Sequence, residues 1–113
     1  MKKFIFFCIT STSIFAQSGD NLELLFNWND PTIVGTSAYN NAYNEVWGLV
    51  VNGREFAVIG STSGTHIFDV TDPINSEQVQ FIPGAASGTQ IIHRDYHDRD
   101  GYLYAVSDEG NST

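Results

Sequence analysis

The stretch VWGLVVNGREFAVIG, residues 46–60, decides the fold. Two runs of strand-forming residues, 46–51 and 55–60, flank the dipeptide Asn52-Gly53. Both residues of this dipeptide tolerate a positive φ, which a two-residue hairpin turn requires, so Asn-Gly between β-formers is a strong hairpin signal. The stretch therefore predicts two antiparallel strands joined by a tight turn.

Two further strands are expected after this hairpin. A turn at Ser63-Gly64 leads into a strand over 65–70, and Asp72-Pro73 ends it, because proline lacks the N–H that a β-ladder needs. A fourth strand is expected over 77–82, before Pro83-Gly84. No stretch has helical periodicity, so the sequence predicts an all-β chain with a turn roughly every eight to twelve residues.

The same pattern returns further along the chain. When Gly64 is aligned with Gly110, Phe56 falls on Tyr102 and the preceding strands come into register. A period of roughly 40 to 50 residues with four strands in each unit is typical of a β-propeller blade. The expected fold is therefore all-β, with four-stranded antiparallel meanders as propeller blades, incomplete at about one and a half blades. A β-sandwich made from the same strands is the alternative.

The first sixteen residues have the pattern of a secretory signal peptide. Lys2 and Lys3 precede an apolar stretch that runs from Phe4 to Phe15, and Ala16 is a small residue suited to a cleavage point. The stretch is interrupted by Thr and Ser and is shorter than the roughly 20 apolar residues of a membrane span. We expect cleavage near Ala16 and a mature chain that is exported to the cell surface or the medium, associated with the outer membrane but not inserted in it.

Removal of this leader changes the charge balance of the chain. The only cysteine, Cys8, leaves with it, so packing rather than disulfides must hold the mature chain together. Three basic residues then remain against 13 acidic ones, a net charge of −10. Because phosphate binding depends on Lys and Arg, this balance excludes nucleic-acid binding.

The chain divides into four expected parts. These are a signal peptide, a loop-rich segment with one short strand at its apolar patch, a first complete blade and the truncated start of the next blade, at residues 1–16, 17–45, 46–84 and 85–113.

One segment carries a candidate metal site. If residues 93–98 form a strand, His93, Asp95 and His97 project to the same side. Two imidazoles and a carboxylate can bind a divalent transition metal, with further ligands from other blades. In the alternative, structural interpretation, His93 and Asp95 form hydrogen bonds between blades, and 98–101 is a polar hairpin turn.

Other catalytic signatures are missing from the sequence. It has no G-x-S-x-G elbow, no cysteine nucleophile after processing and no glycine-rich phosphate loop. We expect His66 to be packed inside a strand. Trp47 and Tyr43 are expected to pack rather than to line a sugar-binding face.

The run GSTSGTHIFDVTDP, residues 60–73, resembles the LVIVD repeat, whose strand ends in a D-V-[ST]-D-P-like turn. YNEVWG at 43–48, HRDYHD at 93–98 and GYLYAV at 101–106 extend the resemblance to the choice-of-anchor B family of secreted bacterial propellers. The resemblance covers roughly residues 22–113 and implies the N-terminal fragment of a longer protein that ends in a variable anchor. It implies no particular chemistry.

A physical role for the motif at 69–73 can be derived from its residue types. Asp72 can accept hydrogen bonds from backbone N–H groups after the strand, and Pro73 fixes φ so that the chain turns outward. Asp69 and Thr71 lie on one side of the strand, where we expect them to tie one blade to the next.

Two functions remain open at this stage. The expected one is a secreted or cell-surface binding scaffold, not an enzyme, without a cofactor. Its partners would be the remaining blades of its own full-length chain and an extracellular protein or glycan. The alternative is a metal-assisted hydrolase that uses the cluster at residues 93–98.

Overall fold

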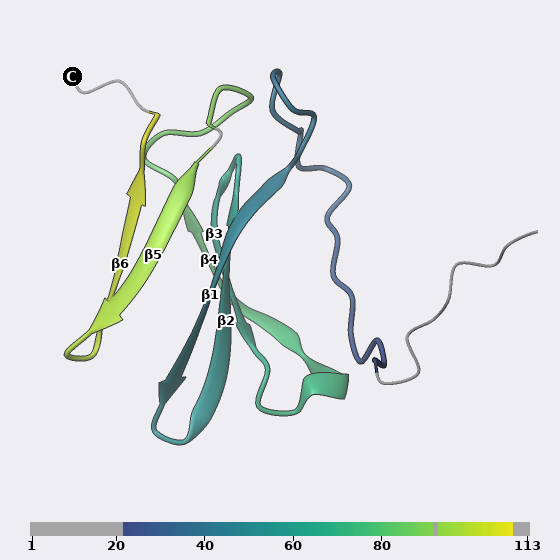
Figure 1. Ribbon diagram of the computed structural model, residues 1–113, viewed down its shortest axis with the longest axis vertical. Helices are drawn as coiled ribbons and strands as arrows, with labels where there is room; N and C mark the ends of the chain where they lie inside the picture. Colours follow the sequence, from purple (N-terminus) through teal and green to yellow (C-terminus); the bar gives the residue numbers. More distant parts are fainter. Residues whose placement is uncertain (1–21, 92, 110–113) are drawn as a thin grey trace, which may run out of the picture.

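A computed structural model describes residues 22–91 and 93–109 of the chain. The expected leader, residues 1–16, lies outside these residues. The described part is all-β, with six strands and one short 3-10 helix (Figure 1). In chain order the elements are β1 Tyr43–Val51, β2 Arg54–Ser61, β3 Gly64–Asp69, η1 Pro73–Asn75, β4 Glu77–Pro83, β5 Arg94–Arg99 and β6 Tyr102–Ser107.

Two hairpins have the same two-residue turn. Asn52 and Gly53 have φ values of 51° and 77° between β1 and β2, and Asp100 and Gly101 have φ values of 52° and 82° between β5 and β6. The Asn52-Gly53 turn is therefore confirmed, since positive φ at both central residues is the signature of a type I′ hairpin turn. The second hairpin turn is confined to Asp100-Gly101 rather than 98–101, because Asp98 and Arg99 belong to β5. The equivalent turns are 48 positions apart. The shift of 46 obtained by aligning Gly64 with Gly110 is therefore wrong by two residues.

Strands β1 to β4 form one antiparallel sheet in the order β1-β2-β3-β4, as the sequence predicts. Side chains alternate between its two faces. Val58 and Thr65 point to one face, which we call the hairpin face, and His66 and Phe68 point to the other, which we call the opposite face. Val58, Thr65, His66 and Phe68 are all buried, so both faces of the sheet are covered over this region.

The β5–β6 hairpin packs on the hairpin face, where β5 contacts β1 and β2. The Tyr96 ring is only 3% exposed, and its hydroxyl lies 3.0 Å from Thr65 Oγ1. Arg94 is also buried, and its Nε donates to the carbonyl oxygen of Ser61 at 2.7 Å. Gly60 permits this close approach, because a Cβ there would lie 3.2 Å from the Tyr96 hydroxyl and 2.9 Å from a β1 carbonyl oxygen. This stacking of two sheets is compatible with an incomplete arrangement of blades.

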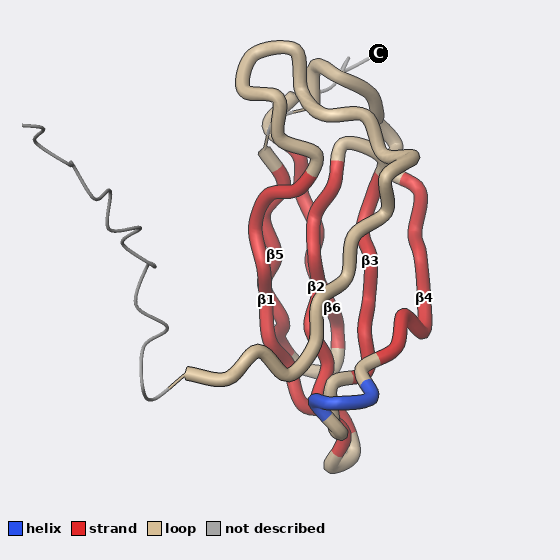
Figure 2. The backbone as a smooth tube through the Cα atoms, turned by 90° about the vertical axis from the view of Figure 1, so that its right-hand side faces the viewer, coloured by secondary structure: helices blue, strands red, loops and turns tan. Residues whose placement is uncertain are grey.

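An extended N-terminal segment crosses the opposite face (Figure 2). Its Trp28 ring packs against Tyr43, His66 and Phe68, with centroid distances of 5.4, 4.9 and 4.9 Å. The sequence predicts a short strand in this apolar patch. The structure instead has extended chain that is assigned to no sheet.

The motif at residues 69–73 acts within one sheet. Asp72 caps η1, since its Oδ1 accepts from the Ile74 amide at 3.2 Å, which confirms its expected role. Asp69 pairs with Arg54, and Thr71 Oγ1 accepts from the Glu55 amide at 2.9 Å. Both partners belong to β2 of the same sheet. The expectation that Asp69 and Thr71 tie neighbouring blades is therefore wrong, because both side chains bond to β2, which pairs with β3 in the same sheet.

Candidate functional site

Strand β5 carries most of the residues that the sequence singles out. Arg94 and Tyr96 are buried against the first sheet, whereas Asp95 and His97 are exposed. This alternation follows from the two-residue period of a strand. His93 precedes β5, which begins at Arg94, so the three candidate ligands do not all belong to one regular strand.

His93 is bound to a residue from the other end of the hairpin. Its Nδ1 lies 2.7 Å from Glu109 Oε1, and its backbone amide donates to Glu109 Oε2 at 2.9 Å. These two contacts join the chain just before β5 to the chain just after β6. They give His93 a structural role in closing the open end of the hairpin. The structural interpretation of the sequence predicts hydrogen bonds from His93 to another blade, whereas its observed partner Glu109 follows β6 of the same hairpin.

Asp95 and His97 face different surroundings. The Asp95 carboxylate accepts the amide of the next residue, Tyr96, at 2.8 Å. The His97 ring lies 5.1 Å from the Trp47 ring, centroid to centroid. Within residues 22–91 and 93–109, no three His, Cys, Asp or Glu side chains gather closely enough to hold a metal ion. The geometry does not bring His93, Asp95 and His97 together into one centre.

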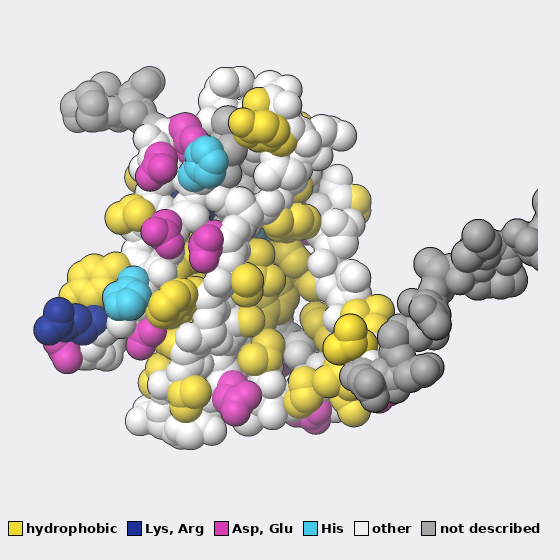
Figure 3. Space-filling model, viewed as in Figure 1, with side chains coloured by type: hydrophobic (Ala, Val, Ile, Leu, Met, Phe, Trp, Pro, Cys, Tyr) yellow, Lys and Arg dark blue, Asp and Glu magenta, His cyan; other side chains and the backbone are white. Residues whose placement is uncertain are grey.

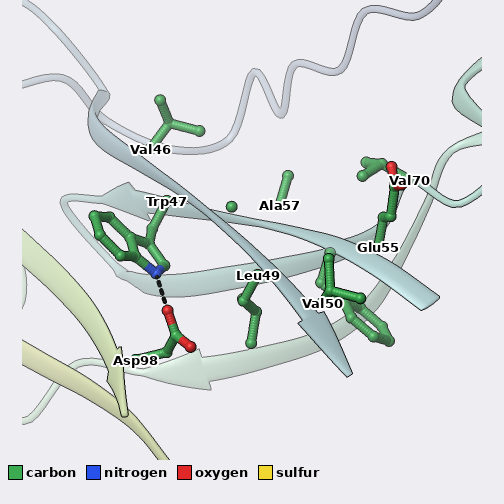
Figure 4. Close-up of a pocket in the computed structure, with 10 residues that line it drawn as sticks. Val46, Trp47, Leu49, Val50, Glu55, Ala57, Val70 and Asp98 are labelled. Atoms are coloured by element: carbon green, nitrogen blue, oxygen red, sulfur yellow. Dashed lines mark hydrogen bonds between the residues drawn. The ribbon is translucent and has the colours of Figure 1, made fainter. Parts of the chain in front are cut away.

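Trp47 connects the two sheets. Its Nε1 donates to Asp98 Oδ1 at 2.8 Å (Figure 4). His97, the neighbour of Asp98, packs against its ring. Trp47 is half-buried rather than fully buried. The prediction that the Trp47 side chain packs is confirmed. Its partner Asp98 was not predicted, because Asp98 is 51 positions away and belongs to the second sheet.

A shallow groove runs beside this contact, along β1 and β2. Gly48 and Ala57 pair across the two strands, and a Cβ on Gly48 would meet no atom within 4 Å, so this part of the surface is open. The groove has a volume of about 440 Å³. Most of its lining is apolar, with Glu55 and Asp98 as its carboxylates, and its residues are Val46, Trp47, Gly48, Leu49, Val50, Glu55, Phe56, Ala57, Val70 and Asp98 (Figure 4).

A second, wider groove lies between the end of β4 and strand β6. Arg94 lies at its base and is 8% exposed. Its Nε and Nη2 donate to the carbonyl oxygens of Ser61 and Ala86, each at 2.7 Å. No carboxylate pairs with Arg94 among the residues that the structure describes. Backbone carbonyl oxygens therefore satisfy this buried cation, and it fastens the β4–β5 connection to the first sheet.

A serine and a histidine also meet inside the first sheet. Ser61 Oγ lies 2.9 Å from His66 Nε2, and His66 Nδ1 lies 3.1 Å from Gln78 Oε1. This chain resembles a nucleophile with its base, but Ser61 is 1% exposed and His66 is 4% exposed, so no substrate can reach them. Ser61 Oγ also accepts the amides of Ser63 and Gly64, each at 3.2 Å. The group therefore fixes the β2–β3 turn, and burial lowers the pKa of His66.

Comparison with known proteins adds no assignment to this geometry. No helix in the described part of the chain is long and apolar enough to cross a membrane. No family model matches the sequence, and no curated protein or solved structure matches it significantly.

Proposed function

We propose that this chain is the N-terminal part of an exported β-propeller that serves as a binding scaffold at the cell surface. The observation that carries the proposal is the stacking of the β5–β6 hairpin on the β1–β4 sheet. The first strands of the two sheets, β1 and β5, contact each other, and both sheets begin with a hairpin of the same turn geometry. Successive sheets of a propeller are related in this way, with their first strands nearest the central channel.

The surface of the hairpin supports the expectation of further sheets. The side of β5–β6 that faces away from the first sheet bears Tyr102, Tyr104 and Val106, which are 70%, 55% and 59% exposed. Their strand partners Arg99, His97 and Asp95 lie on the same side, so the uncovered face is mixed. A two-stranded sheet with such a face uncovered is marginal by itself. In the proposed propeller the remaining blades of the full-length chain cover this face, and the loops between strands bind an extracellular protein or glycan.

The chemistry of the described residues favours binding over catalysis. The imidazoles of His93, His97 and His66 are engaged by Glu109, Trp47 and Ser61 respectively. No observation favours the metal-assisted hydrolase. Export by the leader and membership in the choice-of-anchor B family belong to the same proposal and rest on the sequence motifs.

The experiment that tests this function uses the intact protein recovered from the exporting cell. Its transition-metal content is measured by elemental analysis and its binding on an array of extracellular glycans. The variant His93→Ala/His97→Ala is measured alongside, with Arg99→Ala, which lies on β5 with His97, as the matched control. Glycan binding that survives in all three proteins supports the scaffold. A stoichiometric metal that the double variant loses and the control keeps would overturn it in favour of the hydrolase.

A further inference from the structure

The turn between β1 and β2 holds the only Asn-Gly dipeptide of the sequence, at residues 52 and 53. Both residues are exposed, and a Cβ on Gly53 would meet no atom within 4 Å, so the turn projects into solvent. Figure 3, in the view of Figure 1, shows mostly uncharged polar and backbone surface at the lower end of the sheet, where this turn lies. Within the described residues, the Gly53 amide donates to no backbone acceptor. The turn therefore presents an accessible amide nitrogen directly after an accessible carboxamide.

These two groups can react with each other in water. The Gly53 nitrogen attacks Asn52 Cγ, the bond from Cγ to Nδ2 breaks, and ammonia leaves with the proton that the Gly53 amide gives up through solvent. The product is a five-membered cyclic imide. One water molecule then opens the imide at either carbonyl, which yields aspartate or isoaspartate at residue 52. Glycine favours the attack, because it has no Cβ that would hinder its nitrogen.

The closed turn prevents this attack. The φ values of 51° at Asn52 and 77° at Gly53 identify a type I′ turn. In such a turn ψ of the first central residue is about +30°, which places the next nitrogen on the far side of the Cα–C bond from Cβ. Ring closure requires the Gly53 nitrogen on the same side as the Asn52 Cβ. The reaction therefore proceeds only when the turn opens, and local opening at an exposed turn takes less free energy than unfolding of the sheet.

The second hairpin shows which product fits the closed turn. Asp100 and Gly101 have φ values of 52° and 82°, nearly the same as those of the first turn, so aspartate is accommodated at this position. The aspartate product can therefore close the turn again, with one negative charge added to the net charge of −8. Isoaspartate instead carries the main chain through its Cβ and lengthens the loop by one carbon. The paired residues Val51 and Arg54 are then no longer joined by a two-residue turn.

We propose that Asn52 is a self-modification site, at which the Gly53 nitrogen displaces ammonia when the turn opens, and that the isoaspartate product keeps the turn from closing. This inference is independent of the proposed binding function. Its effect extends beyond the turn, because a hairpin turn sets the register of its two strands. Trp47 of β1 donates to Asp98 of β5, so loss of the β1 register also loosens the docking of the second hairpin.

Peptide mapping of the full-length chain, aged in mildly alkaline buffer with and without urea, tests the site. Tryptic cleavage separates the peptide that ends at Arg54 from the one that begins at Asp100. We expect Asn52 to convert in both samples, at least about tenfold more slowly in the folded chain. A folded chain in which Asn52 never converts would overturn the site. Equal rates in the two samples would overturn the requirement for turn opening.

An internal control and one variant test the role of Gly53. Asn75 precedes a serine, which carries a Cβ, so in urea it should convert at least about tenfold more slowly than Asn52. Gly53→Ala, also measured in urea, where the positive φ of the folded turn is irrelevant, should slow conversion of Asn52 by at least about tenfold. Conversion of Asn52 at the parent rate in this variant would overturn the assignment of the Gly53 nitrogen as the nucleophile.

Unfolding of the two products tests the effect on the hairpin. Asn52→Asp reproduces the aspartate product and should unfold at the same urea concentration as the parent. The isoaspartate form, isolated chromatographically from the aged chain, should unfold at a lower urea concentration. The same midpoint for both forms would overturn the claim that isoaspartate keeps the turn from closing, while the rates above would still decide the modification site.

Discussion

The contact between Tyr96 and Thr65 joins the β5–β6 hairpin to the first sheet, and it can be measured by a double-mutant cycle. The two hydroxyl oxygens are 3.0 Å apart, with Tyr96 3% and Thr65 6% exposed. Tyr96→Phe leaves the Thr65 hydroxyl buried without this partner, and Thr65→Val does the same to the Tyr96 hydroxyl. A buried polar group that loses its partner costs about 1–2 kcal/mol, so each single variant should lose about that much free energy of unfolding.

The double variant removes both hydroxyls and leaves two apolar side chains of nearly the same shape. Replacement of both partners by apolar groups is close to neutral, so we expect the double variant to lose less than about 1 kcal/mol relative to the parent. The two single losses sum to about 2–4 kcal/mol and the double variant loses less than about 1 kcal/mol, so the coupling energy is about 1–4 kcal/mol. Burial raises the pKa of Tyr96, which keeps the phenol neutral throughout the pH range of the assay.

Urea unfolding followed by tryptophan fluorescence is a suitable assay, because Trp47 contacts the hairpin through Asp98. Tyr104→Phe is the matched control, since Tyr104 lies on the outward side of the same hairpin and is 55% exposed. It should change stability by less than about 0.5 kcal/mol. Additive single effects, with a coupling energy below about 0.3 kcal/mol, would refute the docked geometry of the hairpin.

Three further outcomes are expected. Gly64→Ala should lower the free energy of unfolding by roughly 2 kcal/mol or more in urea titrations, because its Cβ would lie 2.8 Å from a backbone nitrogen after β4. Gly48→Ala should be tolerated, because its Cβ would meet no atom within 4 Å. Equal losses of stability in the two variants would contradict the packing around Gly64. Burial lowers the pKa of His66 from 6.5, so the unfolded chain binds the proton more tightly than the folded chain does. The free energy of unfolding should therefore fall as pH drops from about 6.5 towards that lower pKa. His66→Gln should flatten this dependence in thermal melts between pH 7 and 5. Zinc titration followed by calorimetry should give the same heats for the chain and for His93→Ala/His97→Ala. A one-to-one binding curve for the chain that is lost in the variant would support the metal site at these residues.

The hairpins could be predicted from the sequence because their signals are local. The φ values demanded by a two-residue turn restrict residues 52 and 53 to types such as Asn and Gly, and Asp100-Gly101 meets the same demand. The predicted repeat spacing of 46 residues differs from the observed spacing of 48 residues between the two turns. Aligning Gly64 with Gly110 compared glycines outside the type I′ turns, whereas the turns themselves set the register of each hairpin.

The partners of the candidate site residues could not be predicted from their neighbours in the sequence. A two-residue period correctly gives Asp95 and His97 a common side of β5, but it says nothing of what faces them. That His93 would bind Glu109, and that His97 would lie on Trp47, depends on residues that are distant in sequence. The sequence pattern predicted no role for Arg94, although it is a buried cation between the two sheets.

The sequence by itself determined the strands, their turns and their antiparallel order, because strand propensity and turn chemistry act over a few residues and fix each hairpin register. Only the tertiary structure decided how the sheets stack and which side chains meet across the gap. Sheet faces lie about 10 Å apart, so these contacts depend on the positions of whole strands rather than on neighbours in the chain. For the same reason only the structure could place residues 22–30 on the face opposite the hairpin, where the Trp28 ring and the Tyr43 hydroxyl anchor them.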